Sequence, residues 1–229
     1  MSDVSTMTGF FPMTELVLRP NRAVIPAGTE LWRVHRTEYG PGEFNPRLAD
    51  IHFEGGRFEG TVLDRYHSLY LAESPLTALA ESVLRSRPWE PAHSEQRIPY
   101  AVVRERSLSV LRTRCELTLA SLVTGRDLAA VCRDATLLDD ESNYAWTRRW
   151  SSEIRAQAPD VMGLVWDSRR NRGERALVLF HDRLTDVDGG PLEVLPDRGI
   201  PDLASEEGMK QADEILDPLR AKISRPVRY

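Results

Sequence analysis

A strand that runs directly into a helix is the feature that most constrains the fold of this chain. The segment Ser68-Leu69-Tyr70-Leu71-Ala72 has the pattern of a short strand. Ser74 follows as the N-cap residue of a helix, and Pro75 stands at the first helical position, which proline favours. The helix then carries apolar residues at the spacing of one face, and Pro88 ends it: Leu76, Leu79, Ala80, Val83 and Leu84. This junction predicts a fold that contains both strands and helices.

Strands and helices are mixed irregularly along the rest of the chain. Further strands are predicted at residues 30–35, 100–103, 161–168 and 176–180. The last two flank a polar loop, residues 169–174, and predict a hairpin. Helices are predicted at residues 144–156 and 205–216, with a shorter one near residues 127–132. Because the strands do not alternate regularly with the helices, the sequence predicts an α+β domain.

The chain length favours one domain with additional tails. It has 229 residues, and a single domain usually takes roughly 100–200. Residues 1–27 are predicted to be an N-terminal arm, and residues 28–185 the catalytic domain. After Asp186 the composition shifts to Gly, Pro and Asp, so residues 186–229 are predicted to be a C-terminal extension that carries the helix at 205–216.

Composition excludes several classes of function. The formal net charge of −5 argues against direct nucleic-acid binding, which usually needs a basic surface. The N-terminus lacks the pattern of a signal peptide, and no segment approaches the roughly 20 apolar residues that span a bilayer. A cytoplasmic location without membrane contact is therefore expected. Cys115 and Cys132 are expected to be buried free thiols, and the five histidines show no metal-ligand spacing, so no metal is expected.

Three polar residues are candidates for chemistry because of where they stand. Arg57 follows two glycines, which allow a tight backbone conformation. Glu81 flanks the apolar face of the predicted helix, and Ser168 ends a predicted strand. Glu81 and Ser168 also have alternative interpretations, Glu81 as a solvated helix charge and Ser168 as the start of a turn. Their order along the chain, rather than any one of them, points to a site.

This ordered series resembles the RES domain family, which is named after its Arg, Glu and Ser. The resemblance covers about residues 28–185 and is carried by six segments: Leu31-Trp32-Arg33-Val34, Gly55-Gly56-Arg57-Phe58, Leu69-Tyr70-Leu71-Ala72-Glu73-Ser74-Pro75, Ala78-Leu79-Ala80-Glu81, Thr147-Arg148-Arg149-Trp150 and Asp167-Ser168-Arg169. In the family the glycine turn more often continues with Trp and Asn, where this chain has Phe58 and Glu59. The carboxylate in place of an amide leaves the local detail of the pocket open.

The resemblance implies a fold like that of the ADP-ribosyltransferases, with a mixed β core and flanking helices. It also implies NAD as the substrate, no cofactor, and an Xre-type antitoxin as the partner, with the toxin as a homodimer or in a hetero-oligomer. Carried over by position, the site residues are Arg33, Arg57, Tyr70, Glu81 and Ser168.

Each of these residues has a role that fits NAD. Arg33 and Arg57 would hold the pyrophosphate through charge-assisted hydrogen bonds. Glu81 would stabilise the positive charge that develops on the ribose as nicotinamide leaves. Tyr70 would stack on the nicotinamide or support its amide, and Ser168 would hydrogen-bond the ribose or the carboxamide.

Three functions stay open at this level. The first is a toxin that depletes NAD as a glycohydrolase or, with inorganic phosphate as co-substrate, as a phosphorylase. The second is an ADP-ribosyltransferase that modifies a protein or a small molecule from the same pocket. The third is a non-catalytic binding module on the same fold, since fold alone does not determine function.

Overall fold

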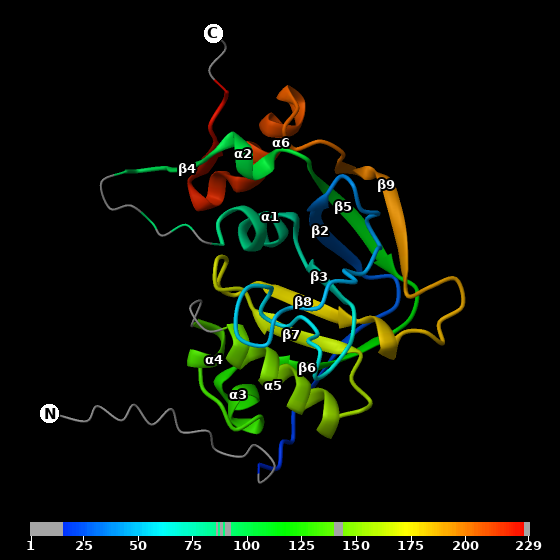
Figure 1. Ribbon diagram of the computed structural model, residues 1–229. Helices are drawn as coiled ribbons and strands as arrows, with labels where there is room; N and C mark the ends of the chain where they lie inside the picture. The colour runs from blue at the N-terminus through cyan, green and yellow to red at the C-terminus, as the bar shows by residue number, and fades with distance from the viewer. Residues whose placement is uncertain (1–15, 86, 88, 90–92, 140–143, 227–229) are drawn as a thin grey trace, which may run out of the picture.

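The computed structural model describes residues 16–85, 87, 89, 93–139 and 144–226, and its centre is an eight-stranded mixed sheet (Figure 1). In spatial order the strands are β1 (Arg22–Ile25), β6 (Leu117–Leu122), β7 (Gly163–Asp167), β8 (Arg175–Phe180), β3 (Ser68–Ala72), β2 (Glu30–Arg36), β5 (Arg106–Thr113) and β9 (Leu192–Ile200). β6 and β7 pair in parallel and the other neighbours are antiparallel, so the predicted β7–β8 hairpin is confirmed.

Two groups of helices pack on this sheet (Figure 1). One group packs near β2 and β5: α1 (Pro75–Val83), α2 (Tyr100–Val103) and α6 (Glu206–Leu216), together with a parallel pair formed by β4 (Gln96–Ile98) and β10 (Ala221–Ile223). The other packs near β6, β7 and β8: α3 (Gly125–Ala130), α4 (Thr136–Asp139) and α5 (Tyr144–Gln157). Two short 3₁₀ turns, His181–Arg183 and Asp217–Leu219, follow β8 and α6. This architecture confirms the α+β prediction.

The sheet is weakest at its middle, where β3 meets β2. The ladder between these strands contains a single residue pair, Trp32 and Ala72, whereas β2 and β5 are paired over seven residues from Glu30 to Arg36. On one face of the junction Trp32 and Ala72 pack in the cluster that contains α1, and Tyr70 packs on the cluster that contains α5. The junction therefore leaves room between the two helix groups.

The predicted strand-to-helix junction is present as expected. The Ser74 hydroxyl caps α1 by accepting a hydrogen bond from the Thr77 N–H, with Pro75 in the first turn. The buried face of α1 carries Leu79 and Val83, and Glu81 stands on the flank of that face. The predicted helices at 144–156 and 205–216 correspond to α5 and α6, and Ser205 is the N-cap of α6.

The prediction of a strand at residues 100–103 is wrong, because this segment forms the single helical turn α2. The Arg104 N–H donates to the Tyr100 carbonyl, and Val103 is the one fully buried residue of the turn. An apolar run of four residues is too short for its periodicity to separate a strand from a helix. In the middle of the chain β4, β5 and β6 were not predicted as strands.

The sequence predicts that the catalytic domain ends at residue 185, but the main sheet continues beyond that point. β9 pairs with β5 and forms one edge of the sheet, and α6 packs against α1. β9 contains Pro196 and Gly199. Both residues are tolerated in edge strands but weaken the sequence pattern from which a strand is predicted. Similarly, β1 lies inside the predicted N-terminal arm and pairs with β6.

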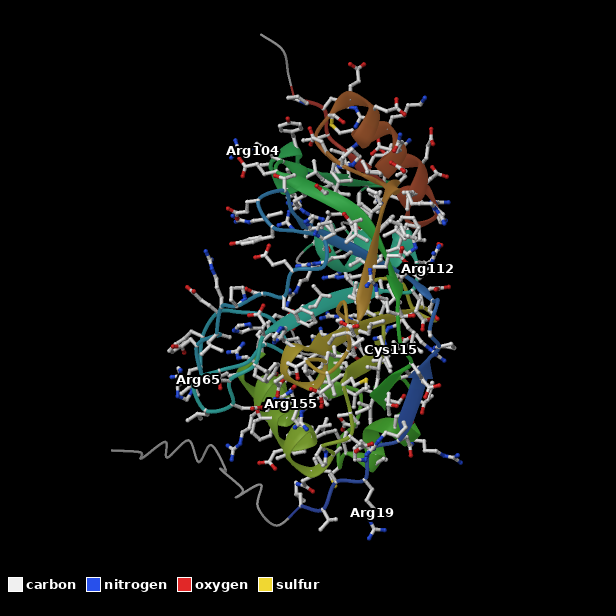
Figure 2. All side chains as sticks on the ribbon, turned by 90° about the vertical axis from the view of Figure 1, so that its right-hand side faces the viewer. Arg19, Arg65, Arg104, Arg112, Cys115 and Arg155 are labelled. Carbon is white, nitrogen blue, oxygen red and sulfur yellow. The ribbon has the colours of Figure 1, made fainter. Side chains whose placement is uncertain are left out.

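Both cysteines are free thiols, as expected, but the prediction that they are buried is wrong. Cys115 is half-buried and Cys132 is exposed; Figure 2 labels Cys115. Cys132 has a positive φ of 57° at the end of the turn after α3, which directs it out of the core. No helix in the described part of the chain is long and apolar enough to cross a membrane.

Candidate active site

A cavity of about 470 Å³ lies at the junction of β2 and β3, beneath α1 and beside the glycine turn at residues 55–60. This volume is typical of a small-molecule site. Four of the five predicted site residues line it: Arg33, Arg57, Tyr70 and Glu81. The structure thus brings together side chains from β2, β3, α1 and the glycine turn, while their roles stay predictions.

Arg57 is a buried arginine in the wall of this cavity, with 6% of its surface exposed. Its carbonyl accepts a 2.6 Å hydrogen bond from the Thr147 hydroxyl on α5, which fixes the backbone. Its guanidinium carbon lies 5.6 Å from the centre of the Tyr144 ring. The buried Nε has no hydrogen-bond partner in the described part of the chain. Because a buried donor without an acceptor costs about 1–3 kcal/mol, this guanidinium is suited to an anionic ligand.

A second buried arginine, Arg148 of α5, holds the glycine turn in place. Its Nη1 donates to the carbonyls of Glu54 and Gly56 at 2.8 and 3.2 Å, and its Nη2 to that of Phe53 at 3.3 Å. The side chain is 1% exposed. The segment Thr147-Arg148, which the sequence comparison with the RES domain singled out without a role, therefore clamps the turn that carries Arg57.

The two glycines of the turn are needed for different reasons. Gly55 has a φ of +80°, where other residues are strained. A Cβ on Gly56 would lie 2.8 Å from the Glu59 carboxylate and 3.0 Å from the Tyr70 hydroxyl. That carboxylate accepts the Gly56 N–H at 2.8 Å, so Glu59 closes the turn on itself.

Glu81 is oriented by Ser168 rather than lying beside it in the cavity wall. The Ser168 hydroxyl donates to Glu81 Oε1 at 2.6 Å and accepts the Asn171 N–H at 3.0 Å. Ser168 is fully buried and does not line the cavity. The direct contact with substrate predicted for Ser168 does not fit this geometry, because its only proton already points to Glu81. Ser168 and Glu81 are nevertheless neighbours, although 87 residues separate them in the chain.

Tyr70 supports the same turn through its hydroxyl, which accepts the Phe58 N–H at 2.8 Å. Burial raises the pKa of Tyr70, and the charge of Glu59 raises it further, so the phenol stays protonated. Its ring meets Trp166 edge to face at 6.2 Å between centroids. Because Tyr70 lines the cavity, its ring can contact a ligand, whereas its hydroxyl oxygen already accepts a backbone N–H.

Arg33 is held by the loop that follows β2. Its Nη1 donates to the carbonyls of Pro41 at 2.6 Å, Glu43 at 2.8 Å and Gly40 at 3.3 Å. Burial lowers the pKa of Arg33 to about 10, against the opposing charge of Glu43, so the guanidinium remains charged at neutral pH. Only part of its fork is therefore free for a ligand.

Among the other residues that line the cavity, three polar or aromatic ones that the sequence did not identify as site residues matter for a ligand: Glu59, Arg85 and Trp166. Arg85 donates to the Tyr144 hydroxyl at 3.2 Å, and its guanidinium carbon lies 4.7 Å from that ring. Burial is the largest influence and lowers the pKa of Arg85, but Tyr144, Tyr70 and Glu81 together outweigh burial and the net shift is upward. Arg85 could have been found from the sequence, because it follows Glu81 by four residues and residues at this spacing share one helix face. The indole N–H of Trp166 is buried and has no hydrogen-bond partner within the described ranges.

Metal-ligating side chains do not gather here. Among the residues that the structure describes, there is no group of three or more His, Cys, Asp or Glu side chains that could hold a metal ion.

Comparison with known proteins agrees with this fold. The RES domain model matches residues 30–198, which is more than half of the chain. A chain of the crystal structure of the M. tuberculosis MbcT–MbcA toxin–antitoxin complex superposes with a TM-score of 0.52 at 13% sequence identity, over 85% of this chain and 92% of that one. No curated protein matches the sequence. On the family match, this chain belongs to the RES domain family.

Proposed function

We propose that this protein is the toxin of a toxin–antitoxin pair and depletes NAD by cleaving the bond between nicotinamide and ribose. The observation that carries the proposal is that Arg57 and Glu81 face one cavity, and that Ser168 orients the Glu81 carboxylate. The family membership and the fold shared with a chain of the MbcT–MbcA complex support the same function.

Arg57 supplies a binding group for the pyrophosphate. The buried Nε lacks an acceptor in the described part of the protein, and a phosphate oxygen would provide one through a charge-assisted hydrogen bond. Arg33 and Arg85, which line the same cavity, add positive charge. The cavity wall is therefore matched to a dinucleotide anion rather than to a neutral ligand.

Glu81 supplies the charge that cleavage of the glycosidic bond requires. Nicotinamide leaves as a neutral ring from a cationic state, so no general acid is needed, and positive charge develops on the ribose. Oε1 of Glu81 is occupied by Ser168, which leaves Oε2 for the ribose hydroxyls. A carboxylate held in advance at this position stabilises the transition state more than the ground state.

Release of nicotinamide from NAD by the purified protein tests the proposal. Mass analysis of the second product, with and without inorganic phosphate, separates hydrolysis from phosphorolysis, and a mass increase of a protein or small molecule identifies ADP-ribosyl transfer. Absence of nicotinamide release under all conditions would favour a non-catalytic binding module and contradict the proposal.

Glu81→Gln is the sharpest variant because it removes the charge and keeps the shape. We expect a loss of nicotinamide release of about a thousandfold, equivalent to about 4 kcal/mol, with an unchanged melting temperature. Glu153→Gln on α5 is the matched control, since Glu153 contacts Gln157 away from the cavity. If Glu81→Gln is as active as the control, Glu81 has no part in the reaction.

The toxin role predicts growth arrest when the protein is produced alone. Arrest should require Glu81 and should be relieved by an Xre-type antitoxin encoded next to it. If the Glu81→Gln variant arrests growth as strongly as the unaltered protein, toxicity does not come from this site.

A further inference from the structure

A second cavity, of about 380 Å³, adjoins the first toward the C-terminal end of β2. Five residues line both: Arg33, Val34, Glu59, Tyr70 and Arg106. The two cavities are therefore continuous around the end of β2. A ligand that fills the first can extend into the second.

Two arginines face each other at this end of the sheet. Arg36 of β2 and Arg106 of β5 are directly paired in the antiparallel ladder, and both line the second cavity. The Cβ atoms of such a pair lie about 4.5–5.5 Å apart, and like charges at this distance destabilise a sheet. The fold thus places two like charges side by side in the wall of the second cavity.

Neither arginine is neutralised by a buried acid. Among the residues that the structure describes, Arg36 has one ion-pair partner, Glu38, at 3.2 Å, and more than half of each side chain is exposed. Arg106 is half-buried and makes no side-chain hydrogen bond or ion pair with the described residues. Burial lowers the pKa of Arg106, and the nearby charge of Arg36 lowers it further.

The lining of the second cavity is positive as a whole. Four arginines and two glutamates line it: Arg33, Arg36, Arg47, Arg106, Glu43 and Glu59. Both glutamates are already engaged, since Glu43 accepts the Gly40 N–H at 2.9 Å and Glu59 accepts the Gly56 N–H at 2.8 Å. Tyr39 and Phe44 add aromatic surface to the same walls.

We propose that Arg36 and Arg106 form a second anion site, which binds a dianionic phosphate group at the continuation of the first cavity. Two planar guanidiniums side by side match the oxygens of a phosphate, and the bound dianion would remove their mutual repulsion. The phosphate is either the 2′-phosphate of NADP or free inorganic phosphate. The use of this site in substrate selection rests on the proposed function, but the anion site itself does not.

Calorimetric titration with three unreactive probes tests the site without any need for catalysis. The probes are adenosine 2′,5′-bisphosphate, adenosine 5′-monophosphate and inorganic phosphate, and the variant is Arg106→Gln. Arg104→Gln is the charge-matched control: this arginine lies at the surface beside α2 (Figure 2), with its side chain 65% exposed and paired to Glu105 at 3.7 Å. Melting temperatures of both variants establish that they fold, and relief of repulsion should keep that of Arg106→Gln at or above the unaltered value.

If the site selects NADP, the bisphosphate binds at least tenfold more tightly than the monophosphate, and Arg106→Gln brings the two within twofold. If the site takes inorganic phosphate, that probe binds on its own and loses at least tenfold with Arg106→Gln, while the 2′-phosphate gives no advantage. The proposal is overturned if Arg106→Gln changes no affinity by more than twofold, or if Arg104→Gln has the same effect. Nicotinamide release, measured separately, shows whether the proposed function fails independently of this site.

Discussion

Ser168→Ala separates two possible roles of this serine, contact with substrate and orientation of Glu81. The change removes the 2.6 Å hydrogen bond to Glu81 Oε1. A hydrogen bond to a charged group contributes about 1.5–3 kcal/mol. If that energy is used to hold the carboxylate in position, kcat for nicotinamide release should fall about 10- to 100-fold. KM should change little, because Ser168 is buried behind the cavity wall.

A double-mutant cycle with Glu81→Ala tests whether Ser168 acts through Glu81. Residues that act as one unit are strongly non-additive. In the Glu81→Ala background, Ser168→Ala should therefore lower the residual rate by less than about twofold. Single-turnover measurements at high enzyme concentration make that residual rate accessible. If Ser168→Ala costs the same factor in both backgrounds, the serine acts on the substrate directly and the positioning role is refuted.

Ser121→Ala is the matched control for this experiment. Ser121 is also a buried serine that donates to a carboxylate, that of Asp127, at 2.8 Å, but it lies outside the cavity. Both variants should lose about 1–2 kcal/mol of stability through the lost hydrogen bond. Only Ser168→Ala should lose activity. Equal losses of activity would mean that the effect is one of stability alone.

Four further predictions concern stability, and thermal or denaturant unfolding measures each. Arg148→Met should cost at least about 3 kcal/mol, because three carbonyls of the glycine turn lose their donor. Arg57→Met should leave stability unchanged or higher, because the buried Nε has no partner within the described residues; a loss as large as that of Arg148→Met would contradict this. Gly163→Ala should cost about 3 kcal/mol, because its Cβ would lie 2.0 Å from a carbonyl oxygen, whereas Gly125→Ala, with open space, should gain about 0.5 kcal/mol. Burial raises the pKa of Asp127, but hydrogen bonds outweigh burial and hold it below the ordinary value of 3.8. A depressed carboxyl pKa contributes stability at higher pH that is lost as pH falls below about 4, so Asp127→Asn should lose less stability there than the unaltered protein; an equal loss would contradict the assignment.

The parts of the fold that follow from neighbouring residues could be predicted from the sequence. The cap and proline of α1 and the hairpin between β7 and β8 depend on residues that are close together in the sequence. β5 and β9 could not be predicted in the same way. β5 reads Arg-Ser-Leu-Ser-Val-Leu-Arg-Thr, and its pattern makes sense only once β2 and β9 flank it. Tertiary pairing, rather than local preference, decides such strands.

The residues of the candidate site could be predicted, but the hydrogen bonds among them could not. Arg33, Arg57, Tyr70 and Glu81 could be carried over by position from the resemblance to the RES domain family, and all four line the cavity. The hydrogen bonds from Arg148 to the glycine turn could not be predicted from the sequence, because their acceptors are main-chain carbonyls, which every residue has. The same is true of Tyr70, whose hydroxyl binds a backbone N–H. Side-chain identities reveal which groups are present, but not which of them the backbone already uses.

The hydrogen-bond inventory of the site separates the groups that build it from the groups that remain for a ligand. The Nη atoms of Arg148 and the hydroxyls of Tyr70 and Ser168 are engaged within the protein. Within the described part of the chain, the buried Arg57 Nε and the Trp166 indole N–H are not. Buried polar groups are almost always paired in native proteins, so unpaired ones that line a single cavity call for a separate cause. A ligand that supplies the missing acceptors is such a cause, and it implies that the free protein holds these donors ready at the expense of its own stability.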